Sequence, residues 1–338
     1  KSNHLDKILS SLTKHHYKNS IGYKKILDSI GFKLDKKISY LNLPFLPVRL
    51  FKMHSLKSIP DDKLVKTMTS SGTSGQEVSK IYLDKETSLN QTRALINIVS
   101  NFLGSKRSPM IIIDSSSVLR NRKMFSARGA GILGFSMFAS KKIYALDENM
   151  NIDFESLAAF IEGNKDSKIF IFGFTFMIYQ HFIMELQKSK IKLDLSNAIL
   201  IHGGGWKKLQ NESVSSKKFK DLLKKLAGID KVHDYYGMVE QTGSIYMECE
   251  EGHLHASIFS DVIIRNPFDF SISPVGEIGI IQTLSILPSS YPGNSLLTED
   301  EGVLLGEDDC KCGRMGKYFK VIGRIKNAEI RGCSDTYE

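Results

Sequence analysis

The sequence predicts an α/β protein in which helices cover both faces of a mostly parallel sheet and a smaller β-rich region follows. Segments of strand and helix pattern alternate over about 130 residues, which is the arrangement that builds parallel sheets. After about residue 245 the helical patterns stop, and short strands separated by turns take over. The length of 338 residues is enough for two domains, or for one large domain with a small appendage.

We expect four regions along the chain. They are a helical N-terminal segment (1–60), an α/β core (61–245), a β-rich subdomain (246–323) and a C-terminal hinge or tail (324–338). The first region has a polar helical pattern and ends in a segment that prolines interrupt, "NLPFLPVRLFKMHS".

The core is expected to begin with a Ser/Thr/Gly-rich loop at 67–80 and a short strand at 80–84. Apolar residues at helical spacing predict a helix from Lys85, and Gly104 is expected to stop it. The following elements are a strand at 109–116, a helix at 127–140, a strand at 141–147, a helix at 153–164, a strand at 167–174, a helix at 175–190, a strand from Asn197 into a Gly-rich turn, a helix at 215–227 and a strand at 232–237. Beyond them, strand patterns at 253–267, 276–285 and 316–325 have no helix between them.

The charge and the apolar content disfavour several function classes. The net charge is +9, from 46 basic and 37 acidic residues, but the basic residues are mostly Lys spread along the chain. Such a distribution disfavours nucleic-acid binding and is compatible with an anionic small substrate such as ATP. The most apolar stretch, 169–179, is too short to span a membrane. The first residues lack a signal-peptide core and do not begin with Met, so we expect a trimmed start and a cytoplasmic protein.

The four cysteines are crowded into the last part of the chain, at Cys249, Cys310, Cys312 and Cys333. Because none lies among the first 248 residues, a disulfide framework is disfavoured. The crowding favours a local metal site or a reactive thiol in a reducing compartment.

Two glycine-rich segments could bind a nucleotide. The segment "SSGTSGQ" (70–76) offers backbone N–H groups and hydroxyls without bulky side chains, as a polyphosphate requires. It is not a GxxxxGK[ST] loop, because no Lys follows Gly75 directly. The segment "HGGGW" (202–206) follows an apolar strand, where glycine lets a ligand approach the backbone. Taken alone, the segment at 70–76 could equally be a solvated turn. The segment at 202–206 could equally be a tight strand-to-helix turn.

Two acidic segments could complete such a site. In "DYYGMVEQTGS" (234–244) an aromatic ring could stack on a base and Glu240 could hold Mg²⁺. Its alternative is the exposed start of a helix, where a glutamate is favourable by itself. In "NSLLTEDEG" (294–302) one of three carboxylates could accept hydrogen bonds from ribose hydroxyls, and the alternative is an acidic turn.

The order of these motifs, followed by "GR" at 323–324, resembles the adenylate-forming superfamily of acyl-CoA, aryl-CoA and luciferase-type ligases. Within it, "SSGTSGQ", "IHGGGWKKL", "YGMVEQTGS" and "GRIKNAEIRGCSD" are most similar to the bacterial acyl-protein synthetases, the fatty-acid ligase component of bioluminescence reductase complexes. The resemblance implies the large N-terminal domain of an adenylate-forming enzyme with a β-rich subdomain.

The resemblance also implies roles for individual residues in binding MgATP. The loop residues Ser70, Ser71, Gly72, Thr73, Ser74 and Gly75 would wrap the β- and γ-phosphates, with Thr73 central. The residues Gly203, Gly204 and Gly205 would line the adenine edge, and Tyr236, followed by Gly237, would stack on adenine. The residue Glu240 would hold Mg²⁺, Asp300 would bind the ribose hydroxyls and Arg324 would reach ribose or phosphate. The helix around Phe174, Met177 and Tyr179 would border an acyl pocket, or it packs in the core.

The sequence departs from the family pattern in three places. The usual T-G-D reads Thr298-Glu299-Asp300, and the lysine expected soon after the phosphate loop is no nearer than Lys80, which receives no catalytic role. The sequence ends 14 residues after Arg324, whereas longer relatives continue into a mobile domain that supplies a lysine and admits CoA. We expect that domain to be essentially absent, which puts CoA transfer in doubt and fits the shorter acyl-protein synthetases.

The cysteines receive two expected roles. The resemblance implies that Cys333, in "IRGCSD", becomes acylated as a thioester, and the nearby Arg331 should favour its thiolate form. The other three suggest a zinc site, because Cys310 and Cys312 form C-x-C while Cys249 and His255 lie six residues apart. Together they would give a closed Cys₃His site for structural Zn²⁺, with His253 as an alternative ligand.

We therefore expect an ATP-dependent ligase that converts a carboxylic acid, expected to be a long-chain fatty acid, to an acyl-adenylate. The acyl group would then move to Cys333 and on to a partner such as a reductase or a carrier. One alternative is an acyl- or aryl-CoA ligase, or an adenylating enzyme that loads a carrier protein. A second is a non-catalytic nucleotide-binding subunit, which the presence of Thr73, Glu240, Asp300 and Arg324 disfavours.

Overall fold

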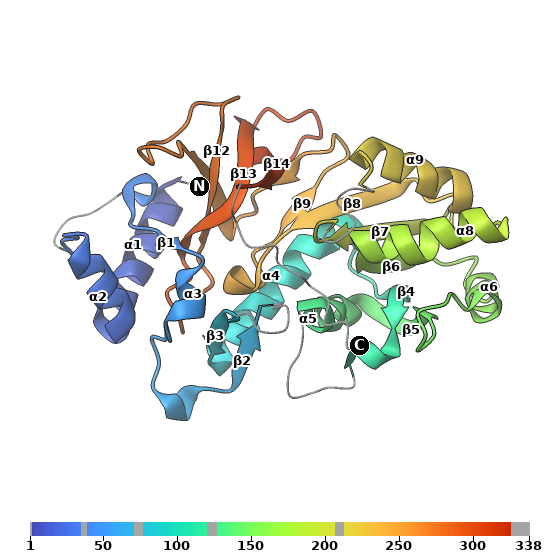
Figure 1. The fold of residues 1–338 in the computed structure, drawn as a ribbon, viewed down its shortest axis with the longest axis horizontal. Coiled ribbons are helices and arrows are strands. Elements are labelled where there is room, and N and C mark those ends of the chain that lie inside the picture. The colour runs from blue at the N-terminus through green and yellow to red at the C-terminus, as the bar shows by residue number, and fades with distance from the viewer. Residues whose placement is uncertain (1, 35–38, 71–76, 120–126, 207–212, 326–338) are drawn as a thin grey trace. The chain divides into compact units, whose positions relative to one another are not determined.

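The fold is described from a computed structural model that covers residues 2–34, 39–70, 77–119, 127–206 and 213–325 (Figure 1). The described residues form two compact units. Residues 2–98 and 237–325 make up the first unit, and residues 99–236 make up the second. The chain passes from the first unit to the second inside one helix, α4 (Lys85–Leu103).

The second unit is built on a parallel sheet. Its strands are β4 (Ser108–Ser115), β5 (Ala139–Leu146), β6 (Ile169–Phe174), β7 (Ala198–Gly203) and β8 (Lys231–Tyr236), in the order β5-β4-β6-β7-β8. Every neighbouring pair is parallel. All residues of the three inner strands are buried, as expected where both faces are covered. The predicted parallel α/β fold is confirmed.

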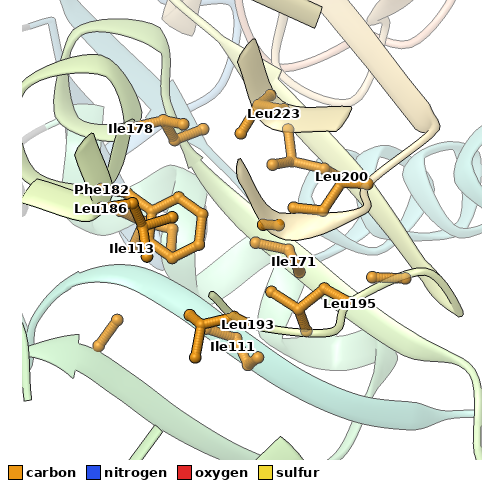
Figure 2. Close-up of a cluster of buried hydrophobic side chains, with 14 of the residues drawn as sticks. Ile111, Ile113, Ile171, Ile178, Phe182, Leu186, Leu193, Leu195, Leu200 and Leu223 are labelled. Atoms are coloured by element: carbon orange, nitrogen blue, oxygen red, sulfur yellow. The ribbon is translucent and has the colours of Figure 1, made fainter. Parts of the chain in front are cut away.

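Helices cover both faces of this sheet. One face carries α6 (Phe154–Glu162), α7 (Thr175–Ile178), α8 (Met184–Ser189) and α9 (Ser216–Ala227). Figure 2 shows the buried side chains between them, where Ile111, Ile113 and Ile171 from the strands meet Ile178, Phe182 and Leu223 from the helices. On the other face, Phe135 of α5 (Ala127–Phe135) stacks on Phe172 at a centroid distance of 4.3 Å.

Two predicted helices of this unit differ from the observed ones. The helix predicted at 127–140 ends at Phe135, and after the 3₁₀ turn Ser136–Phe138 the chain already forms β5 from Ala139. The helix predicted at 175–190 contains a π-helical turn, Tyr179–Ile183, between α7 and α8. Apolar spacing does not distinguish a π turn from an α turn, because one inserted residue shifts the pattern only slightly.

The first unit contains an antiparallel sheet. Its strands are β9 (Tyr246–Glu248), β10 (Leu254–His255), β11 (Ser260–Arg265), β12 (Ile278–Ser285), β13 (Ser295–Glu307) and β14 (Lys317–Arg324), in the order β11-β12-β13-β14-β10-β9. Two further strands, β2 (Lys66–Thr69) and β3 (Lys80–Leu83), form a hairpin. The prediction of a β-rich region is confirmed, but its strands are not all short, because β13 has 13 residues. The acidic turn considered at 294–302 is wrong, because residues 295–302 lie inside β13.

The N-terminal helices belong to the same unit as this sheet. The helices α1 (Ser2–Asn19), α2 (Ile21–Ser29) and α3 (Leu50–Met53) precede or follow β1 (Leu46–Pro47), and β1 pairs in parallel with β13. The side chains of Leu5 and Leu9 pack with Leu284, so α1 covers part of the sheet. Short 3₁₀ turns at Tyr40–Asn42 and Asp61–Lys63 complete the segment.

The compact units therefore differ from the predicted boundaries at residues 60 and 245. The physical reason is long-range pairing: the segment before residue 60 supplies a strand and three helices to the β-rich region. The buried ring of His16, for example, bonds through Nδ1 to Ser58 Oγ at 2.8 Å and through Nε2 to the Pro288 carbonyl at 3.1 Å. Among the described helices, none is both long enough and apolar enough to cross a membrane.

Candidate functional site

The Ser/Thr/Gly loop closes the β2–β3 hairpin of the first unit. Its first predicted phosphate ligand, Ser70, is buried and holds the base of the loop, because its Oγ accepts the Ser79 N–H at 2.9 Å. The Ser70 N–H in turn donates to the Ser79 carbonyl at 3.1 Å. The remaining predicted ligands, Ser71, Gly72, Thr73, Ser74 and Gly75, lie outside the described residues. The structure thus gives Ser70 a role in closing the loop.

The glycine turn follows β7 in the second unit. A Cβ atom on Gly203 would lie 2.4 Å from Cε1 of Tyr235, so the close approach of that ring requires glycine. The next residue, Gly204, has a φ of 74°, in the left-handed region that favours glycine. Both Gly204 and Gly205 are exposed, so their backbone faces solvent. This geometry meets the requirement for close approach of a ligand to the backbone.

A cluster of aromatic side chains next to this turn was not predicted from the sequence. The ring of Tyr235, and not that of the predicted Tyr236, packs against Gly203. Its centroid lies 5.3 Å from the ring centroid of Phe135 and 6.4 Å from that of Phe172. The predicted base-stacking residue Tyr236 ends β8 and is half-buried. The doublet "YY" could have signalled two separate roles, since neighbouring strand residues point to opposite faces.

The π-helical turn also contacts the glycine turn. The ring of Tyr179 meets Trp206 edge to face at 4.9 Å, and Trp206 follows Gly205 directly. The hydroxyl of Thr175 donates to the Gly203 carbonyl at 3.3 Å. Of the residues considered for an acyl pocket, Phe174 and Met177 are buried, and Arg128 Nη1 lies 3.9 Å from Met177 Sδ.

The buried His202, at the end of β7, is held neutral by its surroundings. Burial, together with the charge of Lys220 and the proximity of His233, lowers the pKa of His202 to about 3. Its Nδ1 lies 2.9 Å from Thr175 Oγ1. In the first unit, burial similarly lowers the pKa of His16 to about 3.

These two histidines predict that the protein loses stability on mild acidification. In the unfolded chain each histidine is protonated near pH 6.5, whereas in the folded protein it is protonated only near pH 3. The free energy of unfolding therefore falls as the pH drops below 6.5. At pH 5 each histidine should lower the free energy of unfolding by about 2 kcal/mol relative to pH 7. Urea unfolding at pH 7 and pH 5 measures this slope, which His202→Gln should flatten and the exposed control His54→Gln should not. Equal slopes in the two variants would contradict the assignment.

The predicted Mg²⁺ ligand, Glu240, is fully buried in the 3₁₀ turn Val239–Gln241 of the first unit. The alternative of an exposed helix start is therefore wrong. Burial and the negative charge of Glu240 raise the pKa of Tyr291, whose hydroxyl accepts a hydrogen bond from Gln91 Nε2 at 3.2 Å. The adjacent Gln241 donates through Nε2 to the Gly293 carbonyl at 2.7 Å. Proteins usually bury a carboxylate where it is paired or binds a metal ion.

Close backbone contacts fix this turn. A Cβ atom on Gly293 would lie 2.8 Å from the Glu240 carbonyl oxygen, and one on Gly243 would lie 2.5 Å from the Gln91 carbonyl oxygen. The φ of Gly243 is 85°, so this position requires glycine on both grounds. The predicted neighbour Gly237 begins the segment and is exposed. The backbone around Glu240 therefore has little freedom to move.

The predicted ribose ligands lie opposite each other in the first unit. In the β13–β14 pair, Asp300 is the partner of Arg324, and Arg324 Nε lies 3.6 Å from Asp300 Oδ1. Both side chains are partly exposed. The structure thus brings together two residues that the sequence analysis placed in one site by resemblance alone.

The four predicted zinc ligands also converge in the first unit. The ligand atoms of Cys249, His255, Cys310 and Cys312 all lie within 4.8 Å of one another. The Cys249 and Cys310 sulfurs are 4.0 Å apart, and Cys312 Sγ lies 3.4 Å from His255 Nε2. Tetrahedral zinc with such ligands needs separations of about 3.3–3.8 Å, so the cluster needs only a small contraction.

The surroundings of this cluster suit a metal ion. Burial raises the pKa of Cys249 to about 12, which shows how costly an unscreened thiolate would be there. Burial acts in the same direction on Cys312, but the Arg314 N–H, at 3.4 Å, and other hydrogen bonds outweigh it and lower that pKa. The imidazole of His255 stacks on Tyr318. The alternative ligand His253 approaches Cys310 through Nδ1 at 3.4 Å but is not part of the four-residue group.

Comparison with known proteins identifies the family. The family model described as "Acyl-protein synthetase, LuxE" matches residues 1–338. The chain belongs to the acyl-protein synthetase (LuxE) family. Like the named members of that family, this acyl-protein synthetase is a ligase.

Two curated relatives share the name "Long-chain-fatty-acid--luciferin-component ligase". The protein from Vibrio harveyi is 22% identical to this acyl-protein synthetase over 338 residues, which cover 97% of this chain and 85% of the relative. The protein from Aliivibrio fischeri is 23% identical over 306 residues, covering 86% of this chain and 77% of the relative.

Solved structures of other proteins share the fold. A 2-hydroxyisobutyryl-CoA ligase bound to 2-HIB-AMP and CoA matches 96% of this chain and 70% of its own with a TM-score of 0.72 at 14% identity. The ATP-bound MatB from Rhodopseudomonas palustris matches 79% of this chain and 49% of its own with a TM-score of 0.52 at 13% identity. This acyl-protein synthetase therefore has the fold of adenylate-forming ligases, as predicted.

Proposed function

We propose that this acyl-protein synthetase uses ATP to activate a long-chain fatty acid as an acyl-adenylate, and then transfers the acyl group to its own Cys333. The observation that carries the proposal is the family match over the whole chain. Support comes from the fixed turn around Glu240, the facing pair Asp300 and Arg324, and the exposed glycine backbone after β7.

In the first half-reaction, a carboxylate oxygen of the fatty acid attacks the α-phosphorus of ATP, and pyrophosphate leaves. By the family resemblance, the phosphate loop, with Thr73 central, would donate hydrogen bonds to the β- and γ-phosphates, and Glu240 would hold the Mg²⁺ that would offset their charge. The carboxylate of Asp300 accepts hydrogen bonds from the ribose hydroxyls, and Arg324 contacts ribose or phosphate. Adenine lies along Gly203–Gly205 and stacks on Tyr236.

In the second half-reaction, the thiolate of Cys333 attacks the acyl carbonyl carbon, and AMP leaves with the electron pair of the broken C–O bond. A thiolate is a strong nucleophile and the adenylate is a good leaving group, so the step depends mainly on proximity. The thioester then passes its acyl group to a protein acceptor. The names of the two curated relatives favour a long-chain fatty acid as the substrate and a luciferin component as the acceptor.

A CoA ligase is the second candidate, because structural relatives include one bound to CoA. The deciding experiment supplies MgATP and labelled fatty acid, first without CoA and then with it. The proposal expects pyrophosphate exchange that depends on the fatty acid, and hydroxylamine-labile label on the protein without CoA. Label that appears only on added CoA would favour the second candidate, and ATP binding without exchange would indicate a non-catalytic subunit.

We also propose that Cys249, His255, Cys310 and Cys312 hold a structural Zn²⁺. The soft thiolate and imidazole donors suit this ion, and four protein ligands leave no open position for catalysis. The ion would tie the β9–β10 hairpin to the connection between β13 and β14. It supplies folding free energy when bound, because the unfolded chain offers no preformed site.

The zinc proposal predicts about one equivalent of zinc per chain, lost on Cys310→Ser replacement together with at least about 2 kcal/mol of stability. Metal analysis and thermal unfolding with and without a chelator measure both quantities. The matched control His253→Gln should keep its zinc. Less than about half an equivalent in the wild-type protein would contradict the site.

A further inference from the structure

A carboxylate at the family's usual glycine position lies between two arginines. The Glu299 Oε1 is 3.1 Å from Arg49 Nε, and its Oε2 is 2.7 Å from Arg324 Nη2. The Glu299 side chain is only 15% exposed, so solvent screens these ion pairs less than it screens pairs on the open surface. Both carboxylate oxygens therefore contact an arginine.

The fold holds this arrangement from several directions. The Val48 N–H donates to the Leu297 carbonyl at 2.9 Å, which extends the β1–β13 pairing and delivers Arg49 beside Glu299. The Ile325 N–H donates to the Glu299 carbonyl at 3.1 Å, on the side of Arg324. The segment that supplies Arg49 thus lies 250 residues before Glu299 in the sequence. Because closing so long a loop costs entropy, a chance contact between the two residues is disfavoured.

The nearby Thr298 holds the backbone at Asp300. The hydroxyl of Thr298 donates to the Ile281 carbonyl at 2.8 Å and accepts the Asp300 N–H at 3.1 Å. The Asp300 carboxylate is 3.6 Å from Arg324 Nε, a looser approach than the 2.7 Å contact between Arg324 and Glu299. The guanidinium is thus shared unequally between two carboxylates, and Glu299 makes the shorter contact.

We propose that Glu299 and Arg49 are positioning residues for the nucleotide. By taking the Nη2 edge of Arg324, Glu299 prevents the two-bond fork pairing of Arg324 with Asp300 that arginine and carboxylate otherwise favour. The Asp300 oxygens are then presented to ribose hydroxyls, and Arg49 offsets the added negative charge of Glu299. The inference rests on the proposed function only in assigning Asp300 and Arg324 to ATP.

The test compares nucleotide binding in Glu299→Gln and in the wild-type protein by calorimetry, with ATP and 2′-deoxyATP as the probes. We expect Glu299→Gln to bind ATP about three- to fivefold more weakly and to lose most of the preference for ATP over 2′-deoxyATP. In turnover assays the KM for ATP should rise while the KM for the fatty acid stays the same. Because Glu299→Gln is nearly isosteric, thermal unfolding should change little.

Three further variants separate positioning from a general charge effect. The control Glu307→Gln removes an exposed charge from the same strand and should change neither nucleotide affinity nor the preference. Replacing Arg49 with lysine should restore part of the affinity that Arg49→Ala loses, because an ammonium can still pair with Glu299.

The inference is overturned if Glu299→Gln binds both nucleotides as the wild-type protein does. A wild-type protein that binds ATP but shows no exchange with fatty acid would contradict the proposed function, while the comparison of nucleotides would still decide the role of Glu299. A wild-type protein that does not bind ATP would contradict both proposals.

Discussion

Replacing Cys333 with serine is expected to abolish the hydroxylamine-labile label that forms on the protein from MgATP and labelled fatty acid. A serine hydroxyl is far less ionised than a cysteine thiol near neutral pH, so it attacks the acyl-adenylate much more slowly. The measurement is label on the denatured protein before and after hydroxylamine, with pyrophosphate exchange recorded in parallel. Exchange should fall far less than labelling, because it reports only the first half-reaction.

The matched control for this variant is Ser334→Ala, which removes the neighbouring hydroxyl and should keep its label. Both residues lie outside the described part of the structure, so the prediction rests on the family motif "IRGCSD". Label that survives in Cys333→Ser would assign acylation to another group and contradict the second half-reaction as proposed.

Replacing Glu240 with glutamine is expected to lower pyrophosphate exchange by about 100-fold, because the amide keeps the shape of the side chain but holds Mg²⁺ poorly. Raising the Mg²⁺ concentration should restore part of the exchange rate, because a higher concentration compensates for the weaker binding of the ion. Exchange rates over a Mg²⁺ titration measure both effects. Because Glu240 is fully buried, thermal unfolding of the variant must be measured as well.

The exposed Glu251→Gln is the matched control for Glu240 and should exchange at the wild-type rate. If Glu240→Gln exchanged normally, the carboxylate would be a structural partner of the Tyr291 region and not a Mg²⁺ ligand. If it instead lost stability without a change in the Mg²⁺ dependence, the same structural interpretation would hold.

Local patterns in the sequence predicted a large part of the fold. The strand from Pro109 and the helix from Lys85 were recognisable because their apolar residues follow one period over many positions. The convergence of Cys249, His255, Cys310 and Cys312 was predictable from residue type and spacing, since all four cysteines of the chain lie in its last 90 residues.

Contacts between distant segments could not be predicted in this way. Nothing in the segment around Arg49 indicates that it pairs with a strand near residue 297, and the contact appears only when β1 lies beside β13. The ring that requires glycine at position 203 also comes from another strand, and one-residue alternation alone could not choose Tyr235 over Tyr236. The surroundings of Glu240 likewise come from distant segments, because Gly293 packs against the Glu240 backbone and Gln91 of α4 packs against Gly243.

The pairing of β1 with β13 has a consequence for the order in which the protein folds. The second unit is one continuous stretch, so a ribosome completes it before most of the first unit's sheet has been made. Apolar side chains of the N-terminal helices, such as Leu5 and Leu9, therefore stay uncovered until strands more than 200 residues later have been made. We expect newly made chains to be most vulnerable to aggregation during this interval, and proteolysis of stalled chains should cut the N-terminal helices first.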